Sequence, residues 1–111
     1  MSEAPGGPLA GLRIVELATV VAGPGVGKYL ADFGADVVKV EAPAGDPARR
    51  MGWTGPGEAD SYFFKLLNRN KRTVTLDLKS DGGRADFAAL VAGADALIEN
   101  MRPGKLAALG F

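Results

Sequence analysis

The sequence predicts an α/β fold with a Rossmann-like parallel sheet. Short segments rich in β-branched residues alternate with segments of helical periodicity, and glycines mark the boundaries between them. This alternation occurs twice along the 111 residues, which is typical of two successive βαβ units. Such units give parallel strands with helices on the faces of the sheet, and the length suits one domain, residues 1–111.

The first unit is predicted from two apolar strands and the segment between them. Residues 12–17 predict a strand bounded by Gly11, and residues 36–41 predict a second strand rich in valine. The segment 22–33 has the length of a crossover helix, and Gly34 is a helix-ending residue at its carboxyl side.

The second unit repeats this order. Residues 72–78 alternate between polar and apolar side chains, residues 82–92 have helical periodicity, and residues 96–99 predict a fourth strand. Ser80 with Asp81 is a natural N-cap for the helix, and Gly93 is a natural end.

The remaining segments interrupt this regular order. Residues 1–8 are predicted to be a flexible N-terminus without the features of a secretory signal. Residues 42–60 contain three prolines and four glycines, which predicts an excursion loop that serves a function or contacts a partner. A short helix is expected at 61–67, and a further helix from Pro103.

Composition excludes several classes of site. The 13 basic and 13 acidic residues cancel, which argues against binding to nucleic acid or to a membrane surface. Without cysteine or histidine, the chain lacks thiolate ligands, a cysteine nucleophile and the commonest general base, and we predict no metal site. No apolar stretch approaches the ~20 residues of a membrane span, so we expect a cytoplasmic location.

The glycine-rich turn after the first strand, residues 20–28, has the position at which α/β folds bind ligands. A dinucleotide fingerprint would use Gly23 and Gly25, with Glu41 as the ribose-binding acid, but Lys28 stands where the third glycine belongs. A phosphate-binding P-loop would need serine or threonine after Lys28. Alternatively, the glycines only permit close packing of the strand against the helix.

Two polar clusters are further candidates. The cations of residues 68–72 either bind a phosphate or belong to a solvated loop, and Asp77 is either a surface acid or a cap of the next element. Glu99 and Asn100 follow the fourth strand, at the edge where open α/β sheets bind ligands; alternatively, Asn100 caps the next helix.

Four aromatic residues lie close together in the sequence. They could line a pocket for an adenine or an acyl chain, although aromatic side chains on a short helix more often belong to a core or an interface. They are Trp53, Tyr62, Phe63 and Phe64.

Four segments in this order resemble the family III CoA-transferases of the CaiB/BaiF type, whose superfamily includes the α-methylacyl-CoA racemases. The matching segments cover nearly the whole chain, and their order and spacing carry the resemblance. They are residues 8–17 with 22–24, residues 30–41, residues 68–79, and residues 94–104 with 109–111.

The resemblance implies that the chain is the N-terminal part of the family's large domain, a partial CoA-binding domain within an interlocked homodimer. The substrates would be a CoA thioester and a carboxylic acid acceptor, with no tightly bound cofactor. Three residues would lie near the CoA and the active site, one near the adenine and two beside the pantetheine, and two more would belong to the CoA site. In that order they are Val20, Val21 and Ala22; Leu76; Asn100 and Met101; and Arg72 and Lys79.

The chain also departs from the family pattern. Ala42 and Ala108 stand where the family often has basic residues, which puts the phosphate contacts in doubt. The family's catalytic aspartate, which forms a mixed anhydride with the acyl group, is expected beyond this chain. None of Asp32, Asp36, Asp77 and Asp95 occupies its position, so no catalytic residue is predicted and the chain alone is expected to be inactive.

Three alternatives remain open. The long loop containing residues 45–46 and the segment 61–64 favour the transferase branch over a racemase fragment. The second alternative is a stand-alone nucleotide-binding module. The third is a structural or dimerisation piece that binds no ligand.

Overall fold

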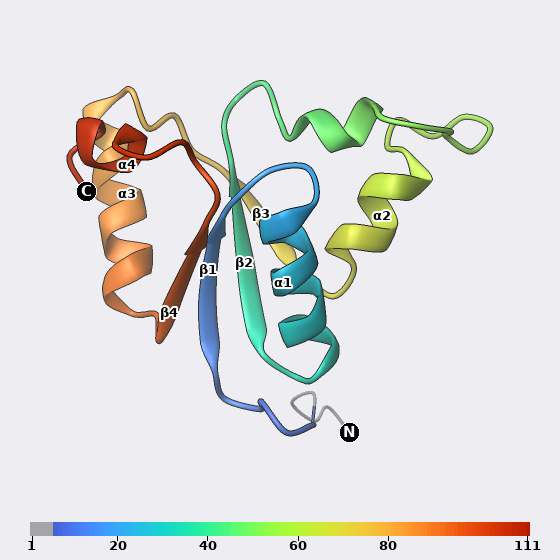
Figure 1. The fold of residues 1–111 in the computed structure, drawn as a ribbon, viewed down its shortest axis with the longest axis horizontal. Helices are drawn as coiled ribbons and strands as arrows, with labels where there is room; N and C mark the ends of the chain where they lie inside the picture. The colour runs from blue at the N-terminus through green and yellow to red at the C-terminus, as the bar shows by residue number, and fades with distance from the viewer. Residues whose placement is uncertain (1–5) are drawn as a thin grey trace.

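The fold is a four-stranded parallel sheet in the order β3-β2-β1-β4, with helices on both faces, which confirms the predicted class (Figure 1). The computed structural model describes residues 6–111, so residues 1–5 of the predicted flexible segment lie outside the described residues. The elements are β1 (Arg13–Leu17), α1 (Ala22–Asp32), β2 (Asp36–Glu41), the 3-10 helix η1 (Pro47–Arg50), α2 (Tyr62–Asn68), β3 (Arg72–Thr75), α3 (Asp81–Ala92), β4 (Ala96–Glu99) and α4 (Lys105–Ala108).

The parallel register brings the carboxyl ends of all four strands to one edge of the sheet, at the top of Figure 1. Leu17 of β1 pairs with Glu99 of β4, and Glu41 of β2 pairs with Thr75 of β3. The segments that follow the strands therefore meet at this edge, where ligand sites of open α/β sheets lie.

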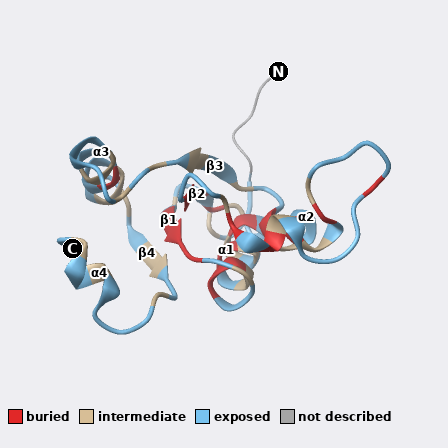
Figure 2. Cartoon of the chain, turned by 90° about the horizontal axis from the view of Figure 1, so that it is seen from above, coloured by how far each residue is buried: buried red, intermediate tan, exposed pale blue. Residues whose placement is uncertain are grey.

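Alternating side chains divide the core between the two faces of the sheet. Ile14 and Val37 pack with alanines of the α1 side, whereas Val15, Leu17 and Val40 pack with Phe87 of α3. Burial is concentrated in β1, β2 and the adjoining part of α1, while β4, α3 and α4 are largely exposed (Figure 2). The well-packed part of the chain is thus the β1–α1–β2 unit.

The predicted ends of α3 are confirmed. The hydroxyl of Ser80 accepts a hydrogen bond from the amide of Gly83 at 3.0 Å, and Gly93 is the C-cap. Ser61 caps α2 in the same way, through the amide of Phe64 at 3.1 Å. Within residues 6–111, no helix is long and apolar enough to cross a membrane.

The end of β3, the start of α4 and the content of the loop 42–60 differ from the prediction. β3 ends at Thr75 rather than at residue 78, because Asp77 begins a turn in which its carbonyl accepts from the amide of Ser80 at 3.0 Å. α4 begins at Lys105 rather than at Pro103, after Gly104 in the left-handed conformation with φ 84°. The loop 42–60 contains η1, whose first turn is capped by Asp46.

Candidate functional site

Asn100 joins the carboxyl end of β4 to the turn between β1 and α1. Its Oδ1 accepts a hydrogen bond from the Thr19 amide at 3.1 Å, and its Nδ2 donates to the Thr19 carbonyl at 2.8 Å. The alternative that Asn100 caps the next helix is wrong, because the N-cap position of α4 is Gly104. Asn100 thus lies at the carboxyl edge of the sheet, as predicted, next to the turn between β1 and α1.

The turn next to Thr19 adopts a backbone conformation that valine rarely accepts. Val20 has φ 69°, in the left-handed region, where a β-branched side chain costs about 1–3 kcal/mol. Its amide donates to both carboxylate oxygens of Asp46, at 3.2 and 3.4 Å. Beside it, Lys39 Nζ donates to the carbonyl of Ala18 at 2.9 Å. Side chains from three parts of the chain therefore fix this turn.

The start of α1 presents backbone amides without acceptors. Within residues 6–111, the amides of Val21, Ala22 and Gly23 donate no hydrogen bond, and α1 has no side-chain cap. The first bond of the helix is donated by Gly25 to the Val21 carbonyl at 2.7 Å. Free amides at a helix start attract phosphate, carboxylate or carbonyl oxygens.

The glycines of this turn have a packing role, as the third interpretation predicted. A Cβ on Gly23 would lie 2.3 Å from the Cβ of Ala18, and a Cβ on Gly27 would lie 2.0 Å from Glu16 Oε1. Gly25 has nothing within 4 Å of its would-be Cβ. Close packing of α1 on β1 thus accounts for two of the three glycines.

The charged residues that suggested a nucleotide site have other partners. Glu41 is buried and accepts two hydrogen bonds from Arg49, at 2.9 and 2.6 Å, and one from the Asp46 amide at 2.8 Å. The bonds from Arg49 lower the pKa of Glu41, against the opposing effect of burial. Lys28 pairs with Asp32 at 3.5 Å. The carboxylate of Glu41 and the ammonium of Lys28 are thus already engaged by groups of the chain itself.

A cleft of about 600 Å³ opens beside the turn at the carboxyl edge, and a second cavity of about 400 Å³ adjoins it. The two spaces share Leu17, Ala42, Met101 and Lys105 in their linings, and we call them together the edge cleft. Of the predicted contacts, Leu76, Lys79, Asn100 and Met101 line the edge cleft, and Val20 to Ala22 follow directly on Ala18 and Thr19, which also line it.

Three cations line the edge cleft without an ion pair in the described part of the chain. Lys79 was predicted as a contact, but Arg102 and Lys105 were not. Arg102 and Lys105 could have been predicted from their position soon after the fourth strand, in the segment that follows the carboxyl edge of the sheet. They bring positive charge to a cleft that is also lined by Ala42, the position at which the family pattern led us to expect a basic residue.

The cations of residues 68–72 are all engaged with acids of the chain. Arg69 pairs with Asp32 at 2.9 Å on the surface, as a solvated loop predicts. Lys71 contradicts that interpretation, because its side chain is fully buried and its Nζ lies 2.6 Å from Glu16 Oε1. Lys71 Nζ also donates to the carbonyl of Pro24 at 2.9 Å, and burial lowers its pKa. It holds the first turn of α1 against β1.

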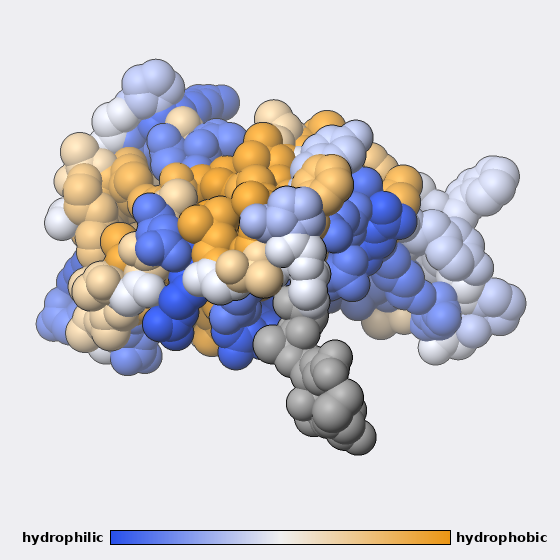
Figure 3. Space-filling view, turned by 90° about the horizontal axis from the view of Figure 1, so that it is seen from below, coloured by the Kyte–Doolittle hydropathy of each residue, from blue (hydrophilic) through white to orange (hydrophobic). Residues whose placement is uncertain are grey.

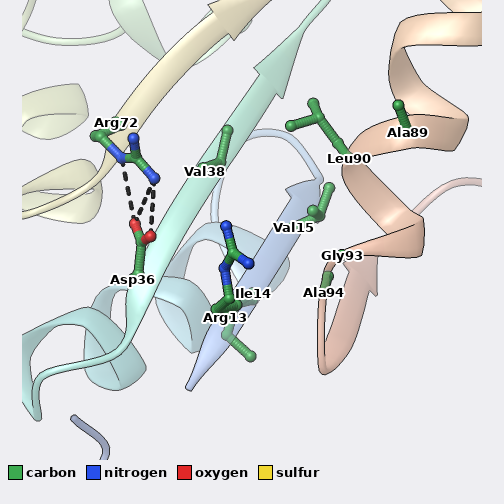
Figure 4. Close-up of a pocket in the computed structure, with 10 residues that line it drawn as sticks. All are labelled: Arg13, Ile14, Val15, Asp36, Val38, Arg72, Ala89, Leu90, Gly93 and Ala94. Atoms are coloured by element: carbon green, nitrogen blue, oxygen red, sulfur yellow. Dashed lines mark hydrogen bonds and ion pairs between the residues drawn. The ribbon is translucent and has the colours of Figure 1, made fainter. Parts of the chain in front are cut away.

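Arg72 lies at the other end of the sheet. It begins β3 and pairs with Asp36, the first residue of β2, at 2.8 Å (Figure 4). Both residues line a small cavity of about 130 Å³ between the amino ends of the strands and α3. Seen from this end, the surface carries a broad apolar area (Figure 3). The structure therefore does not bring Arg72 together with the other predicted contacts.

The surface pair of Arg69 and Asp32 gives a pH-dependent prediction. Hydrogen bonds from Arg69 lower the pKa of Asp32 from 3.8 to about 2, so its stabilising effect is complete above pH 3.8 and is lost as the pH falls through 2. In Arg69→Met, we expect the pKa of Asp32 to return toward 3.8 in a carbon NMR titration of its carboxyl group. Arg72→Met is the matched control, since Arg72 pairs with Asp36 instead. An Asp32 pKa unchanged in Arg69→Met contradicts this account.

The aromatic residues do not line the edge cleft. Phe64 is buried beneath Arg49, whose guanidinium carbon lies 4.0 Å from the ring centroid. Trp53 is 86% exposed and Tyr62 is 53% exposed. The prediction that these aromatic side chains belong to the core is thus confirmed for Phe64.

Comparison with known proteins places this arrangement in a family. The sequence pattern of CoA-transferase family III matches residues 9–111, which is nearly the whole chain. The chain belongs to this family. The residues matched by the family pattern include the β1–α1 turn and every residue that lines the edge cleft.

Two curated relatives of the family are CoA-transferases. The chain is 45% identical over 104 residues to the succinyl-CoA–L-malate CoA-transferase beta subunit of Chloroflexus aurantiacus, covering 94% of this chain and 26% of that protein. It is 42% identical over 103 residues to the formyl-CoA:oxalate CoA-transferase of Afipia carboxidovorans, covering 93% and 24%. The chain spans about a quarter of the length of these relatives.

A solved member of the family has the same fold. The crystal structure of a CaiB/BaiF family protein from Brucella suis superimposes with a TM-score of 0.89 at 45% identity, covering 96% of this chain and 29% of that one. The predicted fold and family are thus both confirmed, and the racemase alternative gains no support from these relatives.

Proposed function

We propose that the edge cleft is part of the CoA site of an acyl-CoA:carboxylate CoA-transferase. The observation that carries the proposal is a cleft at the carboxyl edge of the sheet that is lined, within the described residues, by three cations without an ion pair. Ala18 and Thr19 also line this cleft, and the free amides at the start of α1 follow them in the chain. Coenzyme A has phosphates at one end and a thioester at the other, and needs both kinds of group.

The two ends of the site suit different parts of the ligand. Lys79, Arg102 and Lys105 supply charge for the phosphates, while Leu76 and Met101 supply apolar surface for the adenine and the pantetheine. The free amides that begin at Val21 would receive the thioester carbonyl. Asn100 acts mainly by holding Thr19, since its oxygen and its nitrogen both bond to that residue.

The reaction proposed for the whole protein transfers CoA from an acyl-CoA to a carboxylic acid. Of the four aspartates considered from the sequence, only Asp77 lines the edge cleft, and its Oδ1 accepts from the Lys79 amide at 3.0 Å. We therefore propose that the nucleophilic aspartate comes from outside these 111 residues. The interlocked homodimer and the cytoplasmic location remain predictions.

Calorimetry with CoA, ATP and NAD tests the proposal. The protein is used at the length at which the cell synthesises it. We expect CoA to bind more tightly than ATP or NAD, and more weakly as salt is raised, because the phosphate contacts are screened. Tight binding of ATP or NAD with none for CoA contradicts the proposal and favours a nucleotide-binding module.

One substitution tests the cations of the cleft. We expect Lys105→Ala to weaken CoA binding about tenfold, the loss typical of one charge-assisted hydrogen bond. The matched control is Lys65→Ala, since Lys65 pairs with Glu58 on the surface and does not line the cleft. Equal affinities for CoA in the two variants would remove Lys105 from the site.

A further inference from the structure

We propose that Asp46 is a positioning residue for the CoA site, acting through the left-handed conformation of Val20. The proposal rests on the function proposed above for the edge cleft. The sequence predicts that the loop 42–60 serves a function or contacts a partner, and the proposal gives this loop a specific function, which is to orient the amides that receive the ligand.

Asp46 is held in one orientation from several sides. It is 1% exposed, and its Oδ1 accepts from the Ala48 amide at 2.9 Å, which starts η1. Its own amide donates to Glu41 Oε1 at 2.8 Å, and its Oδ2 lies 2.9 Å from Lys39 Nζ. The carboxylate that meets the Val20 amide therefore has little freedom to turn away.

Lys39 ties the same carboxylate to the strand. Its ammonium is fully buried and reaches three acceptors at 2.9 Å each, namely Glu16 Oε2, the Ala18 carbonyl and Asp46 Oδ2. Two of the three ammonium donors therefore make hydrogen bonds, to Glu16 and Ala18, and the charge also pairs with the Asp46 carboxylate. Lys39 thus fixes residue 18 while Asp46 fixes residue 20, one on each side of Thr19.

The conformation of Val20 decides where the following amides point. A valine leaves the left-handed region unless its surroundings hold it there, because its branched side chain is strained at positive φ. When the carboxylate of Asp46 is lost, we expect Val20 to relax to negative φ. The amides of Val21 and Ala22, which follow Val20 in the chain, are then expected to change direction.

The test is a double-mutant cycle measured by calorimetry with CoA on the protein as the cell produces it. We expect Asp46→Asn to weaken CoA binding about tenfold. Glycine adopts positive φ without strain, so in a Val20→Gly background the same substitution is expected to change affinity by less than about twofold. An equal loss in both backgrounds overturns the proposal, because a merely structural role of Asp46 does not depend on residue 20.

Asp60→Asn is the matched control. Asp60 pairs with Arg49 at 2.9 Å, at the outer end of the same group of charges, and makes no bond to the turn. We expect it to leave CoA affinity unchanged. A loss as large as that of Asp46→Asn would show that any disturbance of the loop 42–60 has this effect, and would overturn the proposal.

Hydrogen exchange supplies a readout that needs neither a folded Asp46 variant nor CoA. In the unsubstituted protein, the Val20 amide is expected to exchange at least about tenfold more slowly than the amides of Val21 and Ala22, which have no acceptor in residues 6–111. Exchange of Val20 as fast as its neighbours overturns the proposal. If the Val20 amide is protected but the unsubstituted protein binds no CoA, the function proposed for the cleft fails, while the positioning of the turn by Asp46 stands.

Discussion

Lys39→Met is expected to lower the free energy of unfolding by about 3–5 kcal/mol, the usual cost of removing one partner from a buried ion pair. Lys39 is 0% exposed, and its ammonium is the only cation among residues 6–111 that pairs with Asp46. Methionine fills a similar volume but leaves that carboxylate buried without a countercharge. Urea denaturation followed by circular dichroism measures the loss.

The matched control is Lys65→Met. Lys65 pairs with Glu58 at the surface, where both side chains are more than 40% exposed, so we expect a loss below about 1 kcal/mol. If the two substitutions cost the same, the buried pair does not stabilise the fold as the geometry suggests.

Gly27→Ala is expected to destabilise the fold by about 3 kcal/mol, at the upper end of the usual cost of overpacking. The new Cβ would lie 2.0 Å from Glu16 Oε1 and 3.1 Å from Lys71 Cε. Glu16 cannot move aside without loosening its pairs with Lys39 and Lys71, at 2.9 and 2.6 Å. The midpoint of urea denaturation reports the loss.

Gly25→Ala, two residues away on the same helix, is its control. Nothing lies within 4 Å of a Cβ at Gly25, and alanine favours a helix over glycine by about 0.5–1 kcal/mol. We therefore expect Gly25→Ala to stabilise the protein slightly. Opposite signs at positions 25 and 27 support the packing account, whereas two losses of equal size contradict it.

The sheet could be predicted from the sequence because its signals are local. Short apolar runs rich in β-branched residues identified β1 and β2, alternation identified β3, and Ser80 and Gly93 identified the ends of α3. β3 was predicted too long because Leu76 and Leu78 continue the alternation after the backbone has turned away at Asp77. Both leucines are partly buried there, so the apolar pattern persists without a strand.

The buried charges were missed, although part of the signal was present. Glu16 lies on the same face of β1 as Ile14, Lys39 lies on the same face of β2 as Val37, and the two charged residues are direct partners in the register. Opposite charges at inward positions of adjacent strands predict a buried pair. The burial of Lys71 had no such signal, because it depends on where α2 returns the chain to the sheet.

The bonds that Glu41 and Lys39 make to Asp46 also restrict how the chain can change in length. Glu41 holds the Asp46 amide and Lys39 holds its carboxylate, so the four residues between Glu41 and Asp46 must span one set distance. An insertion there would withdraw Asp46 from the turn. At Gly57, a Cβ would meet no described atom within 4 Å outside the adjoining residues, so added residues there would extend into solvent. We therefore expect related chains to differ in loop length after η1. The segment between Glu41 and Asp46 should keep the same length.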